Sequence, residues 1–356
     1  MRHLELFSGI GGFRRALDLV AQDGYMNFSC VGYSEIDKNA LKTYQTIYDI
    51  ADEEISLGDI VEFTSNVNNI ENLPNFELLT GGFPCQTFSM MGKQAGFNED
   101  RGQMFFRILD ILRIKMPRFV LLENVKNLFT HDKGNTYKRI VFELEQLGYN
   151  VVSSIFNTVD FHLPQKRNRV LIFATLDHIP DDFKFDPESV KSVFDKVYES
   201  TSLSHYDSVA ELLSSHVDKK YFLSERIKPT ILSDGSANFK SNSEINQDIA
   251  RPLTASMHKM HRACQDNYYS QDYIESQGKI NNAKVLTKEE QAKLFIRRLT
   301  PSEAFALQGF PNEFTIKAHE AKISDGALYK QAGNAVSVNT IYAVLYYLII
   351  NGIIHE

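Results

Sequence analysis

The N-terminal segment constrains the fold most strongly, because a strand pattern, a glycine turn and a helix pattern follow one another without interruption. Residues 4–7 have the pattern of a short strand, residues 8–12 contain three glycines, and apolar side chains recur at helical spacing over 13–20. This order opens doubly wound α/β folds, where glycines let the backbone approach a ligand and the helix N-terminus carries partial positive charge. We therefore expect an α/β fold with a doubly wound, mostly parallel sheet.

The next strand pattern, over residues 30–35, ends in a carboxylate. A fold of this kind commonly places an acid about 20 residues after the glycine turn, where it accepts hydrogen bonds from ribose hydroxyls. Glu35 is the candidate for this role, and Asp37 is expected to cap a helix that begins near Lys38. The glycine turn and the acid fit several nucleotide cofactors, so this part of the chain leaves the cofactor open.

Cys85 follows a buried strand pattern and the turn Gly81-Gly82-Phe83-Pro84. A free cysteine is more often a small core residue than a reactive one. A core cysteine needs no such turn before it, however, and the turn places Cys85 at the tip of a strand, where a side chain can meet a ligand. The other two cysteines stand at unrelated spacings, so the sequence predicts no disulfide framework and no metal site.

The net charge of −7 argues mildly against a nucleic-acid partner, although it describes the whole surface and not one cleft. Basic residues gather in four stretches, at 126–139, 166–169, 219–228 and 258–262. Each stretch alone is more commonly a solvated face, and their joint meaning depends on whether folding brings them to one side. No signal peptide precedes the first strand pattern, and no apolar run reaches the roughly 18 residues of a membrane span. We therefore expect no membrane partner and a reducing, cytoplasmic setting.

The length is typical of about two domains, and the composition changes near residue 177. From about 180 to 293 the sequence is polar and has few clear strand patterns. A long apolar helix pattern closes the chain and needs a large apolar surface to cover it. We expect this helix to return to the first domain, so that the first domain comprises 1–178 plus 325–356 and a second, smaller domain comprises 179–324.

Six sequence blocks, taken in their order along the chain, resemble the DNA cytosine-5 methyltransferases of bacteria and phages. They cover nearly the whole chain except about 180–293, which coincides with the variable target-recognition domain of that family. The blocks are Phe7-Ser8-Gly9-Ile10-Gly11-Gly12, Gly82-Phe83-Pro84-Cys85-Gln86, Glu123-Asn124-Val125, Gln165-Lys166-Arg167-Asn168-Arg169, Arg298-Leu299-Thr300 with Gln308-Gly309-Phe310-Pro311, and Gln331-Ala332-Gly333-Asn334-Ala335-Val336.

The resemblance implies S-adenosylmethionine as cofactor and a catalytic, cofactor-binding first domain. Phe7 would stack on the adenine, and Glu35 would accept hydrogen bonds from the ribose hydroxyls. The other implied cofactor contacts are Ser8, Gly9, Gly11 and Gly12 at the methionine end, Ile36, Asp59 and Ile60 beside the adenine, and Asn334 and Val336 from the C-terminal segment.

The resemblance also implies a set of catalytic and DNA-binding residues, with 179–324 as target-recognition domain and hinge. Cys85 would be the nucleophile, and Glu123 would grip the target cytosine. Arg167 and Arg169 would hold the base and the backbone around it. Side chains two residues apart on an extended stretch lie on the same face, so both arginines could face one cleft. Further implied DNA contacts come from three places. They are Gln86 next to the nucleophile, Ser89 and Arg101 with the mobile loop 90–102, and Lys259 and Arg262 in the second domain.

The proposed chemistry needs these residue types. Addition of a thiolate at carbon 6 of cytosine turns the ring into an enamine, whose carbon 5 can attack a methyl sulfonium. An ordinary cysteine is only about 3% ionised at pH 7, and a nearby arginine such as Arg169 would raise that fraction. Glu123 could accept from the exocyclic amine and, in its acid form, donate to ring nitrogen 3. The target base must first leave the helical stack, at a cost of a few kcal/mol.

Other functions remain to be weighed against this one. A zinc cytosine deaminase requires Pro-Cys-x-x-Cys, whereas Pro84-Cys85 is followed by Gln86, Thr87 and Phe88. A nicotinamide dehydrogenase would share the glycine turn but leaves Cys85 and Glu123 unexplained. An RNA cytosine-5 methyltransferase on the same fold and a catalytically idle DNA-binding relative stay open. The expected partner is double-stranded DNA, bound by a nucleoid-associated monomer, and a cognate restriction endonuclease is a candidate that the chemistry does not require.

Overall fold

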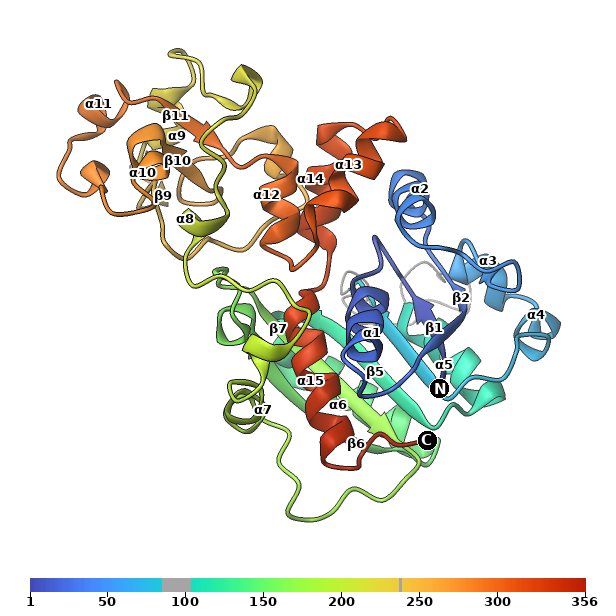
Figure 1. Ribbon diagram of the computed structural model, residues 1–356. Helices are drawn as coiled ribbons and strands as arrows, with labels where there is room; N and C mark the ends of the chain where they lie inside the picture. The colour runs from blue at the N-terminus through green and yellow to red at the C-terminus, as the bar shows by residue number, and fades with distance from the viewer. Residues whose placement is uncertain (85–103, 237–238) are drawn as a thin grey trace. The chain divides into compact units, whose positions relative to one another are not determined.

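The computed structural model of the chain describes residues 1–84, 104–236 and 239–356. Four of the predicted site residues and one predicted loop lie outside these residues: Cys85, Gln86, Ser89, Arg101 and the loop 90–102. The described residues form two compact units (Figure 1). Unit 1 comprises Met1–Asn157, Asn168–Ser202 and Thr340–Glu356, and unit 2 comprises Thr158–Arg167 and Leu203–Asn339.

The boundaries of these units differ from the predicted domains at three places. Residues 179–202 belong to unit 1, because helix α7 (Pro187–Phe194) buries Val190 and Phe194 completely against that unit. Helix α14 (Asp325–Asn334) belongs to unit 2, since it packs against α12 (Pro301–Ala306). The short segment 158–167 also joins unit 2. The terminal helix α15 (Val338–Ile350) returns to unit 1 from residue 340 onward, as predicted.

Unit 1 is built on a seven-stranded sheet with the order β3-β2-β1-β4-β5-β7-β6. All pairs are parallel except those of β7, which runs antiparallel to both β5 and β6. This confirms the predicted doubly wound, mostly parallel sheet. The strands are β1 (Arg2–Leu6), β2 (Ser29–Tyr33), β3 (Ile55–Ser56), β4 (Leu78–Gly82), β5 (Phe119–Val125), β6 (Asn150–Asn157) and β7 (Asn168–Thr175).

Helices cover both faces of this sheet (Figure 1). Alternate residues of each strand point to opposite faces, so Leu4 and Leu6 pack into a core with the apolar side chains of α5 and α6. Glu5, between them, and His3, before them, face the other side, where α1 and α2 pack around Glu5. The remaining helices of unit 1 are α1 (Gly12–Gln22), α2 (Lys38–Ile47), α3 (Ile60–Thr64), α4 (Val67–Glu71), α5 (Met104–Lys115) and α6 (Asn135–Gln146).

The strand order reverses direction at β1 and β4, with β2 and β3 on one side and β5, β7 and β6 on the other. In open α/β sheets, ligands bind in the crevice outside the carboxyl ends of the strands at such a switch point. The carboxyl ends of β1 and β4 are therefore the place where the topology directs a ligand.

Unit 2 consists of short helices and strands joined by long connections, in keeping with the polar sequence of this region. A small apolar core includes Leu223, Ile231 and, from one of the two two-stranded sheets, Tyr268 and Ile296. Its elements are α8 (Val209–Leu212), α9 (Lys228–Leu232), β8 (Gly235–Ser236), β9 (Phe239–Lys240), β10 (Tyr268–Ser270), α10 (Gln271–Glu275), α11 (Lys288–Gln291), β11 (Ile296–Arg298), α12, α13 (Asn312–Glu320) and α14.

Local capping residues begin helices α2 and α12, the first of them where the sequence predicts it. Asp37 Oδ1 accepts the backbone N–H groups of Asn39 and Ala40 at 2.9 and 3.1 Å, which fixes the start of α2. Thr300 and Glu303 form a capping box at the start of α12, and Pro301 occupies the first turn. A capping side chain replaces a hydrogen bond that the first turn of a helix lacks.

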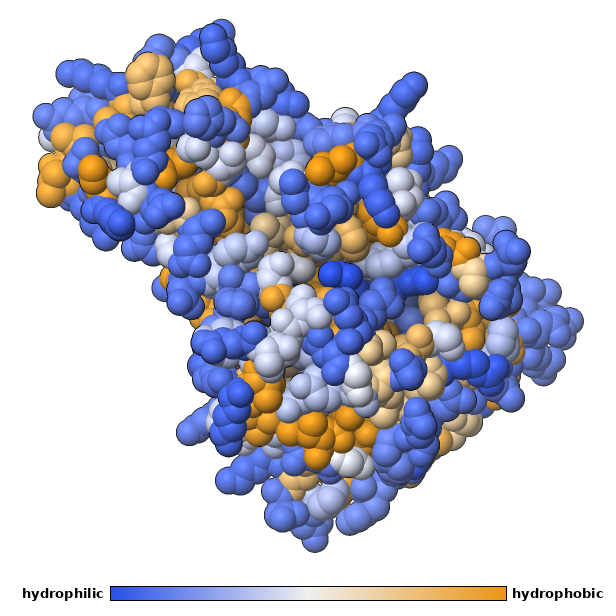
Figure 2. Space-filling model, viewed as in Figure 1, coloured by the Kyte–Doolittle hydropathy of each residue, from blue (hydrophilic) through white to orange (hydrophobic). Residues whose placement is uncertain are grey.

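The helical stretch Asp325–Ile350, which comprises α14 and α15, is long and apolar enough to cross a membrane by length and composition alone. Its most apolar 18-residue window is 83% buried within the protein, so packing against the rest of the chain accounts for its hydropathy as in an ordinary core helix. Hydrophilic side chains cover most of the face drawn in Figure 2, with apolar residues in separate patches between them.

Candidate active site

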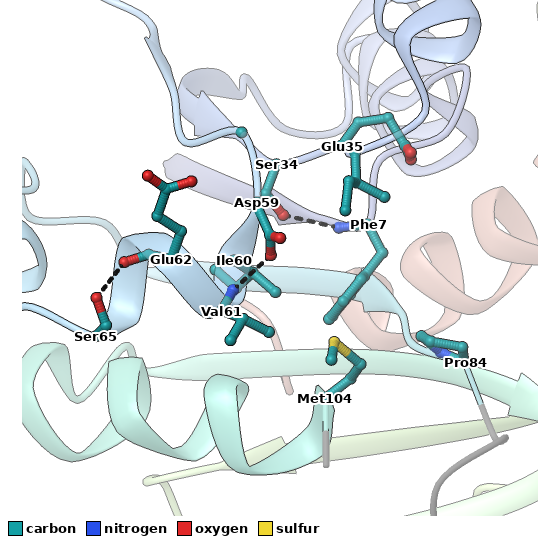
Figure 3. Close-up of a pocket in the computed structure, with 12 residues that line it drawn as sticks. Phe7, Ser34, Glu35, Asp59, Ile60, Val61, Glu62, Ser65, Pro84 and Met104 are labelled. Carbon is teal, nitrogen blue, oxygen red and sulfur yellow. Dashed lines mark hydrogen bonds between the residues drawn. The ribbon is translucent and has the colours of Figure 1, made fainter. Parts of the chain in front are cut away.

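A cavity of about 800 Å³ lies in unit 1 at the carboxyl ends of β1, β2, β3 and β4 (Figure 3). This volume is within the range of pockets that bind small ligands. Five of the predicted cofactor contacts line it: Phe7, Glu35, Ile36, Asp59 and Ile60. The sequence indicated no cofactor contact for the other lining residues: Ser34, Gly58, Val61, Glu62, Ser65, Pro84 and Met104.

Phe7 directly follows β1 and has a positive φ of 54°, which is uncommon for a residue with a side chain. Hydrogen bonds to the end of β2 hold this conformation. The Phe7 N–H donates to Ser34 Oγ at 3.1 Å, and the Ser8 N–H donates to the Ser34 carbonyl at 2.8 Å. The Phe7 ring projects into the cavity above Met104 (Figure 3). Strained backbone that the surroundings enforce is a frequent mark of a functional site.

The Glu35 carboxylate is fixed by two backbone groups on either side of it. Its Oε2 accepts the Gly9 N–H at 2.8 Å, and its Oε1 accepts the Asp37 N–H at 2.7 Å. Glu35 therefore ties the glycine turn after β1 to the start of α2. Because an ionised carboxylate has about four acceptor sites, it retains the capacity to accept hydroxyl groups of a ligand.

Asp59 and Ile60 form the wall of the cavity opposite Phe7 (Figure 3). Asp59 Oδ1 accepts the Val61 N–H at 2.9 Å and thereby caps the short helix α3. Ile60 is buried, whereas Ile36 is 71% exposed and presents an apolar side chain at the rim. The cavity therefore combines apolar side chains, an aromatic ring and carboxylates.

The glycine turn between β1 and α1 contains the other predicted contacts of unit 1, Ser8, Gly9, Gly11 and Gly12. Gly9 and Gly11 have positive φ values of 56° and 77°. A Cβ atom on Gly11 would lie 2.4 Å from the Tyr48 ring, so no other residue fits there without displacing that ring. Ser8 is buried, and Gly12 begins α1.

Glu123 lies near the carboxyl end of β5, where it is the register partner of Gly82 at the end of β4. Arg169 at the start of β7 reaches it, and Arg169 Nε lies 2.7 Å from Glu123 Oε1. Both side chains are largely buried, with exposed fractions of 20% for Arg169 and 11% for Glu123. Cys85 follows Gly82 by three residues in the sequence.

Asn124 is a site residue to which the sequence analysis gives no role. It is buried, and its Nδ2 donates to the Phe83 carbonyl at 2.8 Å, while its Oδ1 accepts the Val125 N–H. The side chain therefore joins the end of β5 to the turn that precedes Cys85. The sequence did contain a sign of this role, because a polar residue stands within the apolar run of β5 and a buried amide needs specific hydrogen-bond partners.

Arg167 has a different environment from the predicted one. It belongs to unit 2 and is 2% exposed, and its guanidinium donates to three backbone carbonyls of that unit. The acceptors are Leu253 at 3.1 Å, Gly333 at 3.1 Å and Ala335 at 2.8 Å. The structure therefore shows Arg167 holding together segments of unit 2, whereas Arg169 belongs to unit 1.

The other predicted residues of unit 2 lie at or near its surface. Asn334 ends α14 and is exposed, and Val336 is buried two residues later. Lys259 is exposed, and Arg262 is half-buried. Lys228, in the basic stretch 219–228, is 3% exposed and pairs with Glu225 at 2.7 Å. It therefore does not contribute to a basic surface.

The residues around the cavity fit S-adenosylmethionine. That molecule carries a cationic sulfonium and ribose hydroxyls, and the cavity offers the carboxylates of Glu35, Asp59 and Glu62 together with the Phe7 ring. Within residues 1–84, 104–236 and 239–356, no group of three or more His, Cys, Asp or Glu side chains could hold a metal ion.

The chain is similar to known proteins in sequence and in fold. The family model for C-5 cytosine-specific DNA methylase matches residues 1–349. The Type II methyltransferase M1.ScrFI of Lactococcus lactis subsp. cremoris is 36% identical over 342 residues, which cover 96% of this chain and 76% of that protein. The Type II methyltransferase M.HaeII of Haemophilus aegyptius is 34% identical over 345 residues, which cover 96% of this chain and 90% of that protein.

Solved structures share the fold at lower identity. The Entamoeba histolytica methyltransferase EhMeth superimposes with a TM-score of 0.74 at 20% identity and covers 100% of this chain and 99% of its own. The S. pombe Dnmt2 methyltransferase gives a TM-score of 0.74 at 19% identity and covers both chains completely. With the family match over nearly its whole length, the chain belongs to the C-5 cytosine-specific DNA methylases, which methylate carbon 5 of cytosine in DNA and use S-adenosylmethionine as the methyl donor.

Proposed function

We propose that this enzyme acts through a covalent adduct between Cys85 and carbon 6 of a flipped-out cytosine, with Glu123 and Arg169 at the reacting ring. The observation that carries the proposal is the Glu123–Arg169 pair at 2.7 Å, at the end of the strand beside β4. The carboxyl group supplies a hydrogen-bonding edge for a base. The guanidinium supplies a cation close to the strand end that Cys85 follows in the sequence.

The cofactor is proposed to occupy the cavity after β1 to β4. Phe7 and Ile60, which line the cavity, would contact the adenine, and Glu35 would accept the ribose hydroxyls. The turn from Ser8 to Gly12, whose Gly9 N–H donates to Glu35, would face the methionine end. When bound, S-adenosylmethionine supplies a methyl group on a cationic sulfur. Pro84, the last described residue before Cys85, also lines the cavity, which supports a nucleophile next to the cofactor.

The residues of the chain then have distinct tasks in the reaction. The Cys85 thiolate adds to carbon 6, and the electron pair of the 5,6 double bond makes carbon 5 nucleophilic. Glu123 accepts a hydrogen bond from the exocyclic amine, and after taking up a proton it donates to nitrogen 3 as negative charge develops on the ring. Once carbon 5 carries the methyl group, loss of its proton and departure of the thiolate restore the aromatic ring.

Unit 2 is proposed to recognise the target sequence in the duplex, with a basic surface centred on Arg298. Arg298 Nη1 donates to the His258 carbonyl at 3.4 Å, and its guanidinium lies over the rings of Tyr221 and Tyr329, 5.9 and 4.6 Å from their centres. Lys220 Nζ also lies over the Tyr221 ring, 4.9 Å from its centre. Arg298 thus brings the basic stretches 219–228 and 258–262 together, which supports Lys259 and Arg262 as contacts to DNA phosphates.

Three further parts of the proposal rest on the relatives and on the substrate. The relatives are named as Type II methyltransferases, which makes a restriction endonuclease of the same specificity a candidate partner in the cell. The enzyme would act as a monomer, since one chain carries both the cofactor cavity and the basic surface. Its DNA substrate would keep it in the cytoplasm with the nucleoid.

Methyl transfer by two cysteine variants tests the proposal. Cys85→Ser should abolish transfer of the labelled methyl group to duplex DNA and leave the dissociation constant for S-adenosylmethionine nearly unchanged. Cys30→Ser is the matched control, because Cys30 Sγ donates to the Gly32 carbonyl and burial raises the pKa of its thiol. Full activity of Cys85→Ser, or loss of activity only in Cys30→Ser, would contradict the assignment.

A second variant tests the carboxyl group. Glu123→Gln keeps the shape of the side chain and an acceptor for the exocyclic amine, but it cannot deliver a proton to nitrogen 3. We expect the rate of methyl transfer to fall by about 10²- to 10³-fold, the usual cost of removing one group that stabilises developing charge. Unchanged single-turnover kinetics would remove Glu123 from the reaction.

A further inference from the structure

A buried polar network lies beneath the glycine turn, on the face of β1 that carries Glu5. Glu5 Oε2 accepts the Tyr44 hydroxyl at 3.0 Å, and Arg14 Nη1 donates to the same hydroxyl at 3.2 Å. Arg14 also donates to both carboxylate oxygens of Glu54, at 2.6 and 2.9 Å. Glu5, Arg14 and Tyr44 are each less than 9% exposed. Neither the family blocks nor the cofactor contacts include Tyr44 or Glu54.

Tyr48 connects this network to the turn itself. Its hydroxyl donates to the Gly11 carbonyl at 2.6 Å and lies 3.4 Å from the Ile10 carbonyl. Its ring fills the space where a Cβ of Gly11 would be, and the Arg14 guanidinium lies over the ring, 5.0 Å from the centre. The side chain is 8% exposed. Tyr48 therefore contacts the turn through both its hydroxyl and its ring.

The contact sets the orientation of one peptide group at the start of α1. In a trans peptide the C=O and N–H groups point in opposite directions. The Gly11 carbonyl accepts both the Tyr48 hydroxyl and the Arg15 N–H, so it points into the protein, and the Gly12 N–H points the other way. Backbone N–H groups at a helix N-terminus are the donors with which such turns bind anionic groups.

We propose that Tyr48 is a positioning residue for the cofactor: its hydroxyl and ring hold the Gly11 peptide so that the Gly12 N–H faces the methionine carboxylate. The inference rests on the proposed placement of S-adenosylmethionine against the turn. Arg14 and Glu54 support Tyr48 from below, because their ion pair fixes the guanidinium on which the ring packs. Tyr48 itself does not touch the reacting atoms.

Removal of the hydroxyl alone tests this role in the full-length protein. Tyr48→Phe should raise the dissociation constant for S-adenosylmethionine, measured by calorimetry, by roughly 2- to 12-fold, as expected for one lost hydrogen bond. The rate constant at saturating cofactor and DNA should stay unchanged. Tyr33→Phe is the matched control. The buried Tyr33 hydroxyl accepts a hydrogen bond from the Gln45 side chain, outside the glycine turn, so its removal should leave cofactor binding unaltered.

The outcomes separate this inference from the function on which it rests. If both variants bind the cofactor as the wild type does, Tyr48 has only a structural role and the inference is refuted. If the wild type itself does not bind S-adenosylmethionine, the proposed cofactor site fails instead.

A second pair of variants tests the ring. Gly11→Ala should weaken cofactor binding strongly, because its Cβ would lie 2.4 Å from the Tyr48 ring and the residue has a positive φ of 77°. Tyr48→Ala removes the ring together with the hydroxyl, so it should bind the cofactor more weakly than Tyr48→Phe. Equal binding by Tyr48→Ala and Tyr48→Phe would show that the ring does not position the turn.

Discussion

Glu5 should make the stability of unit 1 fall as the pH rises. It is completely buried in β1, and burial raises the pKa of its carboxyl from the usual 4.5 to about 8, against the lowering effect of hydrogen bonds from Tyr44 and from the Arg14 backbone. The folded protein therefore holds this proton at pH values where the unfolded chain has lost it. A group of this kind contributes its full stability below pH 4.5 and loses it as the pH rises towards 8.

The size of the effect follows from the two pKa values. With 4.5 for the unfolded chain and about 8 for the folded protein, the linkage relation gives a loss of about 2 kcal/mol between pH 6 and pH 8. Glu5→Gln has a similar shape but does not titrate, so this loss should vanish in the variant. His3 also titrates anomalously, since burial lowers its pKa to about 3, but it is present in both proteins and cancels in their difference.

Urea denaturation at pH 6 and pH 8, followed by far-ultraviolet circular dichroism, measures the difference. The free energy of unfolding of Glu5→Gln relative to the wild type should rise by about 2 kcal/mol from pH 6 to pH 8. A difference that stays constant with pH would mean that Glu5 is ionised in the folded protein, and the account of the buried network would then be wrong.

Two other substitutions test the contacts around the site and the basic surface. Asn124→Ala leaves the buried Phe83 carbonyl without its donor, so we expect a loss of stability of about 1–3 kcal/mol in thermal unfolding. Methyl transfer should also become slower. A rate equal to that of the wild type would mean that Asn124 does not position the turn before Cys85. Lys259→Ala combined with Arg262→Ala should weaken DNA binding, measured by fluorescence anisotropy, and reduce the slope of its salt dependence by up to about 2. An unchanged slope would move the phosphate contacts elsewhere.

Local patterns in the sequence were sufficient for much of the fold and for several residues of the cavity at the carboxyl ends of β1 to β4. The glycine turn after β1 and the acid after β2 are close in sequence to the strand ends that position them, and both appear where they are expected. Asp37 begins α2, and Thr300 with Pro301 begins α12, because capping depends on residues within one helical turn.

Features that depend on distant segments could not be read from these patterns. Arg167 and Arg169 stand two apart in sequence, but the carbonyls that bind Arg167 come from residues 253, 333 and 335, which no local pattern connects to it. Segment 179–202 has a polar composition like the region after it, yet its apolar residues pack on unit 1. Glu5 looks like the exposed position of an alternating strand, and only the packing of α1 and α2 buries it.

The central claim is a covalent bond between Cys85 and the target cytosine, and trapping measures it directly. A duplex in which 5-fluorocytosine replaces the target base blocks the final loss of the carbon 5 substituent, so the adduct accumulates. Mass spectrometry of the digested complex should then find one oligonucleotide bound to the peptide that contains Cys85, and no such conjugate with Cys85→Ser. Absence of a conjugate in the wild type, or its attachment to another residue, would contradict the account.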